Sequence, residues 1–187
     1  MYQKYQTPAI ILRSYEQGEA DRVFALYTEE FGHVWARASA VRRESSRQRY
    51  ALQNYAIANV SLVRGSAGWR LAGASAVASV GDAGSTFARI ANLVGRLVGG
   101  EGRNEYLFQT LFSAHEALRT ASESARGAVE LLAVARVLYA LGYVSAEALG
   151  TALFSHTAFS EEELREAETA RTELLVSVNR ALSETHL

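Results

Sequence analysis

Tryptophan and arginine side chains with the spacing to bind a nucleic acid lie near one another in the first third of the chain. Five arginines fall between positions 37 and 49, and only Glu44 opposes them there; they are Arg37, Arg42, Arg43, Arg47 and Arg49. Trp35 precedes this cluster. An unpaired strand needs an aromatic surface for its bases and positive charge for its phosphates, and these residues supply both. A solvated arginine-rich loop is the alternative reading.

Strand alternation places Trp35 and Arg37 on a common face. In the segment His33–Ala40 the even positions are small or apolar, whereas the odd positions include Trp35 and Arg37. Successive side chains of a strand point to opposite faces, so one face packs and the other presents an aromatic ring and a cation. If the helical part of the chain covers Trp35 instead, Arg37 lies only at its rim.

Short strands separated by turn residues predict a small β-barrel over about the first eighty residues. The predicted strands are Thr7–Ser14, Arg22–Thr28, His33–Ala40, Tyr55–Val63 and Trp69–Ala76. Gly18, Gly32 and the run Gly65–Gly68 provide residues that turn easily. The longest gap, Val41–Asn54, contains most of the arginines, and we call it the arginine loop.

Beyond residue 80 the apolar residues recur with helical spacing. The predicted helices are Phe87–Val98, Leu107–Leu118, Gly127–Leu141 and Ser160–Leu182. Gly142 is placed to end the third helix, and Ser160 with Glu163 has the spacing of a capping box at the start of the fourth. The fold class is therefore α+β, with a barrel domain over residues 1–80 and an all-α helical domain over residues 81–187.

Composition and motifs argue against an enzyme. The chain has no cysteine, which excludes a thiolate nucleophile and a cysteine-ligated metal, and no Walker, GxSxG or HExxH motif is present. We expect no catalytic residue, no metal and no cofactor. No apolar run reaches the length that spans a bilayer, so a cytoplasmic protein without membrane contact is expected. The formal net charge is only −1, but residues 1–80 hold ten basic and six acidic residues, an excess of +4.

Several segments resemble the bacterial RecO family of recombination mediators. They are AIILRS at residues 9–14, GEADR at residues 18–22, Thr28, Gly32, ASAVRRESSR at residues 38–47, and Leu52-Gln53 followed by Tyr55. A weaker match is LYALGY at residues 138–143. The resemblance covers about the first sixty residues in register.

The resemblance implies an oligonucleotide-binding (OB) fold barrel followed by a helical domain, with a non-enzymatic role in recombination repair. RecO-like proteins bind single- and double-stranded DNA, anneal complementary strands, contact the acidic C-terminal tail of single-stranded DNA-binding protein, and act with RecR to load RecA. Carried onto this chain, Arg42, Arg43 and Arg47 become DNA contacts. Trp35, Arg37 and Arg49 are added from charge and strand alternation.

The chain also departs from the family pattern. Many relatives have a four-cysteine zinc module after the Gly-Tyr pair, whereas residues 142–160 contain no cysteine here. Ala40 stands where the family usually has glycine, and Ser39 and Ser45 stand where lysines are common. An alternative function follows: a non-catalytic adaptor of repair proteins with weak or no DNA binding, whose helices hold an acidic peptide in a groove rimmed by Arg119, Arg126 or Arg136.

Overall fold

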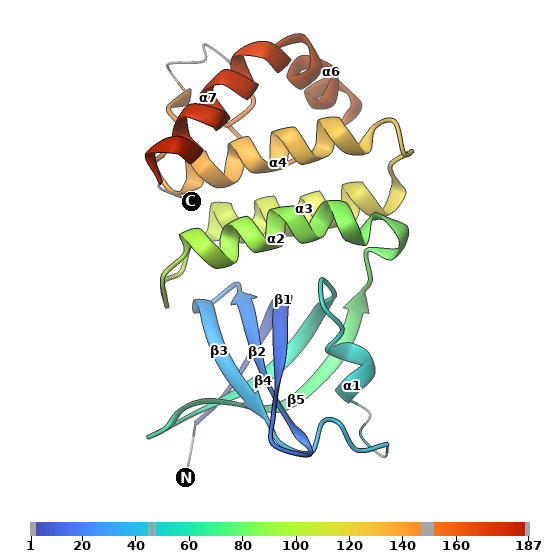
Figure 1. The fold of residues 1–187 in the computed structure, drawn as a ribbon, viewed down its shortest axis with the longest axis vertical. Helices are drawn as coiled ribbons and strands as arrows, with labels where there is room; N and C mark the ends of the chain where they lie inside the picture. Colours follow the sequence, from blue (N-terminus) through green and yellow to red (C-terminus); the bar gives the residue numbers. More distant parts are fainter. Residues whose placement is uncertain (1–2, 45, 47, 147–151, 186–187) are drawn as a thin grey trace. The chain divides into compact units, whose positions relative to one another are not determined.

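The computed structural model describes residues 3–44, 46, 48–146 and 152–185, and it is an α+β protein with an N-terminal β-barrel followed by helices (Figure 1). The chain divides into two compact units. One comprises Met1–Val80 with Ala91–Asn104, and the other comprises Gly81–Ile90 with Glu105–Leu187. The predicted domain limits at residue 80 stay a prediction, and each unit is described by itself.

Five strands close into a barrel in the order β1-β2-β3-β5-β4. They are β1 (Lys4–Gln17), β2 (Asp21–Thr28), β3 (Gly32–Ala38), β4 (Ile57–Gly65) and β5 (Gly68–Ala78). Only the β3–β5 pair is parallel. The long strand β1 closes the barrel because its first half pairs with β4 and its second half with β2. This is the OB-like barrel that the resemblance implies.

Alternation along the strands fills the barrel with apolar side chains. On β3, Val34, Ala36 and Ala38 are buried in the core, whereas Trp35 is 40% exposed. The predicted alternation is confirmed over residues 34–38, but His33, which was predicted on the open face, is only 6% exposed, and the strand ends at Ala38 instead of Ala40. Phe24 and Leu26 of β2 complete the same core.

A β-bulge in β1 changes which side chains face outward. Ile11 pairs with Leu26, but Arg13, two residues further along, pairs with Ala25, the next residue of β2. The extra residue, Leu12, reverses the alternation of the rest of the strand. Residues beyond the bulge therefore lie on the face opposite to the one that simple alternation from Ile11 predicts.

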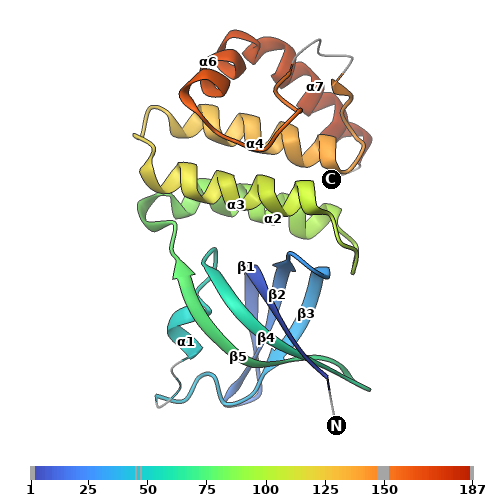
Figure 2. The same cartoon turned by 180° about the vertical axis from the view of Figure 1, so that it is seen from behind.

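The helices differ from the predictions in two places. The described helices are α1 (Gln48–Ala51), α2 (Gly84–Leu97), α3 (Glu105–Thr120), α4 (Arg126–Ala140), α6 (Glu161–Thr169) and α7 (Arg171–Glu184), with a 3-10 turn at Gly81–Ala83. The short helix α1 was not predicted, and it packs against β5 (Figure 2). The single helix predicted over Ser160–Leu182 is wrong, because the backbone leaves helical geometry at Ala170, where ψ is 14°.

Two helix ends follow the sequence closely. Gly142 has φ 81°, and the N–H groups of Gly142 and Tyr143 donate to the carbonyls of Tyr139 and Leu138, which is a Schellman motif at the end of α4. At the start of α6, Ser160 and Glu163 form the predicted capping box. No helix in the described ranges has the length and apolar character to cross a membrane.

Gly32 is the turn glycine with the strictest requirement, and Gly18 is its natural control. Both have φ 65°, but a Cβ at Gly32 collides with the carbonyl of Gly102, whereas nothing lies within 4 Å of a Cβ at Gly18. We expect Gly18→Ala to lower the unfolding free energy by about 1–2 kcal/mol, the cost of left-handed backbone. Gly32→Ala should lower it clearly further, as measured by urea unfolding followed by circular dichroism. Equal losses in the two variants would contradict the close contact.

Candidate nucleic-acid interface

Aromatic and basic side chains gather on the outer face of β1, β2 and β3. The guanidinium carbon of Arg13 lies 5.0 Å from the ring centre of Trp35, in cation-π geometry. The ring of Tyr15, which is 52% exposed, lies 5.8 Å from Trp35. We call Arg13, Tyr15 and Trp35 the aromatic face.

Strand register explains how the aromatic face assembles. Arg13, Ala25 and Trp35 are direct partners across three strands, and Tyr15, Val23 and Arg37 form the next row. The methyl group of Ala25 leaves room for Arg13 to reach across β2 to Trp35. A small residue on the central strand is therefore part of the site.

Arg37, predicted as a DNA contact, lies on the same side of β3 as Trp35 but is paired within the protein. Its Nε and Nη2 donate to Asp21 Oδ2 at 3.0 and 2.6 Å, while the side chain remains 54% exposed. The other oxygen, Asp21 Oδ1, accepts the Ala40 N–H at 2.8 Å. These two contacts, the Ala40 hydrogen bond first and Arg37 second, lower the pKa of Asp21.

Ala40 is held in a strained conformation where the family resemblance implies glycine. Its φ of 55° lies in the left-handed region, which costs an alanine about 1–2 kcal/mol. The hydrogen bond to Asp21 fixes this turn, at which the chain leaves β3 for the arginine loop.

The remaining predicted arginines lie beyond β3. Arg42 donates to the Gly18 carbonyl at 3.1 Å and pairs with Glu16 at 3.1 Å, and Arg43 is exposed. Arg49 stacks on the Tyr50 ring with its guanidinium carbon 4.8 Å from the ring centre, and its Nη2 donates to the Tyr50 hydroxyl at 2.7 Å. The prediction for Arg47 lies outside the described residues.

The arginines differ in how far the protein neutralises them. Asp21 pairs with Arg37, and Glu16 pairs with Arg42. Within the part of the chain that the structure describes, no carboxylate lies at ion-pair distance from Arg43 or Arg49. Among the described residues of the arginine loop, these two arginines therefore have no carboxylate partner, and a role in DNA binding for all six predicted residues stays a prediction.

Sequence reasoning missed Arg13 and Tyr15. Alternation from Ala9 and Ile11, both in the barrel core, points Arg13 inward, where an unpaired charge is costly. That conflict is the one signal in the sequence for the bulge at Leu12. Once the bulge is placed, Arg13 and Tyr15 fall beside Trp35.

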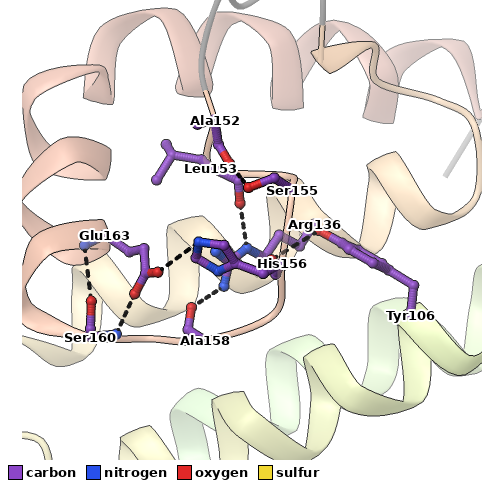
Figure 3. A network of polar contacts seen from close by, with 9 residues as sticks. All are labelled: Tyr106, Arg136, Ala152, Leu153, Ser155, His156, Ala158, Ser160 and Glu163. Atoms are coloured by element: carbon purple, nitrogen blue, oxygen red, sulfur yellow. Dashed lines mark hydrogen bonds and ion pairs between the residues drawn. The ribbon is translucent and has the colours of Figure 1, made fainter.

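The helical unit contains a second polar cluster, centred on Arg136 of α4. Arg136 is fully buried, and it donates from Nε to the Leu153 carbonyl at 2.8 Å and from Nη1 to the Ala158 carbonyl (Figure 3). Its guanidinium also stacks against the ring of Phe159. The expectation that Arg136 rims a peptide groove is therefore wrong. Its guanidinium holds the chain after α4 in place instead of facing a ligand.

Glu163 extends this cluster to the start of α6. One carboxylate oxygen accepts the Ser160 N–H at 2.6 Å, and the other lies 3.1 Å from His156 Nε2 (Figure 3). The sequence predicts that residues 142–160, which contain no cysteine, lack the zinc module of many relatives. Of these residues, 147–151 lie outside the described residues. Among the residues described, no group of three or more histidine, aspartate or glutamate side chains converges as for a metal ion.

Comparison with known proteins finds similarity over the first 79 residues. Residues 1–79 match the family described as recombination protein O N terminal. The DNA repair protein RecO of Desulfitobacterium hafniense (strain DSM 10664 / DCB-2) is 39% identical over 61 residues, which are 33% of this chain and 22% of that protein. RecO of Pelotomaculum thermopropionicum is 38% identical over 61 residues, 33% of this chain and 24% of that protein. The matched segment thus spans about a quarter or less of these relatives' length.

The contacts of Asp21 predict a specific dependence of stability on pH. Because its pKa is lowered in the folded state, its stabilising contribution is present above the ordinary value of 3.8 and is lost as the pH falls through the folded pKa. Asp21→Asn should therefore lower stability at neutral pH and reduce its further loss in acid. Urea unfolding between about pH 5 and pH 2 measures this. The exposed Asp82→Asn is the control, and a full acid-induced loss in Asp21→Asn would refute the role of Asp21.

Proposed function

From the match of residues 1–79 to the family described as recombination protein O N terminal, we propose that the protein binds DNA strands and promotes their annealing during recombination repair. The family points to DNA repair and recombination. Strand binding, annealing and assistance to RecA loading are the activities proposed for this chain.

The aromatic face is the observation that carries the proposal. Trp35 and Tyr15 expose aromatic rings side by side on an OB-like barrel, and the faces of β2 and β3 in such barrels bind oligonucleotides. Bases stack on these rings whatever their sequence, because every base has a π surface. Arg13 and Arg37 lie close enough to meet the phosphates of the same strand.

The arginine loop supports annealing by electrostatics. Two complementary strands repel each other through their phosphates, and cations that neutralise phosphates release counterions and lower that repulsion. Arg43 is exposed, and the Arg49 guanidinium contacts Tyr50 and no carboxylate among the described residues, so both cations can meet a phosphate. No covalent step is needed, and we assign no catalytic residue.

Partners are proposed on the same premise. The partners that this family match suggests are RecR, the acidic C-terminal tail of single-stranded DNA-binding protein and, indirectly, RecA. Of the three arginines predicted to rim a peptide groove, Arg136 is buried, so Arg119 and Arg126 remain as cations for an acidic tail. Arg119 pairs with Glu116 at 2.8 Å.

A non-catalytic adaptor is the second candidate, and the internal pairing of Arg37 and Arg42 favours it. Those ion pairs reduce the positive charge that DNA meets. Fluorescence anisotropy with a labelled oligonucleotide and with a labelled acidic tail peptide separates the two functions. Binding of the peptide without binding of DNA would establish the adaptor and overturn strand binding.

Removal of the arginine loop's charge should abolish most DNA binding. For the variant in which Arg42, Arg43, Arg47 and Arg49 are all alanine, we expect the slope of log K against log salt for a single strand to flatten by about 3, from about 0.7 per arginine. Anisotropy titrations over a range of salt concentrations measure this slope. The control replaces four exposed arginines of the helical unit, Arg119, Arg165, Arg171 and Arg180, and should retain binding. Equal losses of DNA affinity in the two variants would show that the affinity depends on the net charge of the protein and not on the position of these arginines.

Loss of Trp35 should weaken the binding of single strands more than the binding of duplex DNA. Trp35→Ala removes a stacking surface worth about 1–3 kcal/mol per base, so single-strand affinity should fall roughly tenfold or more. Duplex affinity should change little, because paired bases are already stacked. Tyr143→Ala, which removes an exposed aromatic ring from the helical unit, is the matched control. Equal losses for single strands and duplex would contradict base stacking on the aromatic face.

A further inference from the structure

A cavity of about 330 Å³ is lined by residues of β1, β2, α1 and the arginine loop, and it does not include the aromatic face. Three arginines, Arg22, Arg42 and Arg49, are among the residues that line it. Its floor is apolar, because Phe24, Val41 and Leu52 belong to the barrel core. This volume is near the lower end of the range for small-molecule sites.

Strand register brings the cavity's charged groups together. Glu16 of β1 and Arg22 of β2 are direct partners, on the same side of the sheet as the core residue Phe24. Arg42 comes from the start of the arginine loop and Arg49 from α1. Three cations from three segments thus converge over an apolar floor.

A single carboxylate bridges two of the three arginines. Glu16 Oε1 lies 3.4 Å from Arg22 Nη2, and Glu16 Oε2 lies 3.1 Å from Arg42 Nη2. Arg49 donates to the Tyr50 hydroxyl and meets no carboxylate in the described ranges. The cavity therefore keeps a net positive charge of about two, from three arginines and one glutamate.

The Nε of Arg22 has no hydrogen-bond partner among the described residues, and it is buried. A buried donor without an acceptor is unfavourable, so an anion around which the Arg22 side chain rearranges could supply the missing acceptor.

We propose that this cavity binds a phosphate monoester, presented by the end of a DNA strand or by a free nucleotide, and that Glu16 holds the phosphate's place until the ligand binds. The bridging carboxylate supplies two anionic oxygens to two guanidiniums, as a phosphate does. The strand-end source rests on the proposed function, whereas the free-nucleotide source does not.

The charge of the cavity favours a monoester over the phosphodiester inside a strand. A monoester carries a charge of about −1.5 to −2 and three strong acceptor oxygens, which match three guanidiniums. A phosphodiester carries a single negative charge shared by two oxygens, so it matches the three guanidiniums less well.

The test compares oligonucleotides that differ only at their ends. Short single strands with a 5′-phosphate, a 3′-phosphate or two hydroxyl ends are titrated by anisotropy against the wild type, Glu16→Gln and Arg22→Gln. The wild type should bind one phosphorylated end severalfold more tightly than the hydroxyl ends. Glu16→Gln should raise that preference further, by about tenfold, since the competing carboxylate is neutralised. Arg22→Gln should abolish it, and Arg180→Gln, an exposed arginine of α7, should leave it unchanged.

Calorimetry with deoxyadenosine monophosphate and with deoxyadenosine tests the second source. Binding of the monophosphate alone, lost in Arg22→Gln, supports the site even if no oligonucleotide binds, in which case the proposed function fails by itself. Equal affinity for all three strand ends in every variant, together with no binding of the monophosphate, overturns the site. The proposed function then stands on the salt-dependent affinity for hydroxyl-ended strands. Because Glu16→Gln and Arg22→Gln should act in opposite directions, a general loss of folding cannot imitate the expected pattern.

Discussion

The extra residue in β1 determines which side chains of that strand face outward from the barrel. β1 must pair with β4 in its first half and with β2 in its second half, and the bulge at Leu12 rotates the chain between the two. Ile11 consequently faces the core, whereas Arg13 and Tyr15 face outward and Glu16 lies opposite Arg22. Without that rotation a guanidinium would point into a barrel filled by Phe24 and Leu26, where its burial without a partner is prohibitive.

The acidic residues beside the arginines position these side chains without removing them from solvent. Ion pairs at exposed sites contribute about 0–1 kcal/mol, so an incoming phosphate can displace the carboxylate at little cost. Asp21 differs from Glu16 because it also holds the Ala40 N–H, and that hydrogen bond fixes the turn into the arginine loop. Asp21 thus shapes the loop, whereas Glu16 competes for the cations. Charge counts alone do not distinguish these roles.

The sequence predicts those parts of the structure that depend on local rules. The five strands, the two faces of β3, the glycine at the end of α4 and the capping box of α6 each follow from a few neighbouring residues. The bulge at Leu12 is not local, because it is defined by pairing with β2, and it hides Arg13 and Tyr15 from an alternation argument. The break at Ala170 carries no proline or glycine. For the site, Trp35 and Arg37 were recognised from one strand, while their neighbours on β1 required the register.

The role of Arg136 in the helical unit likewise depends on contacts with residues distant in the sequence, which local rules do not predict. From sequence it is a cation on an apolar helix, and such a residue suggests a surface for acidic partners. In the structure burial lowers the pKa of its guanidinium, while Tyr106, Glu163 and Glu166 oppose that effect by favouring the charged form. An arginine stays charged in proteins, so its buried cation must be matched by carbonyl dipoles, and Leu153 and Ala158 supply them from the segment that follows α4. The charge thereby fixes the positions of Leu153 and Ala158, and a partner that needs an arginine on this unit must find it elsewhere than at Arg136.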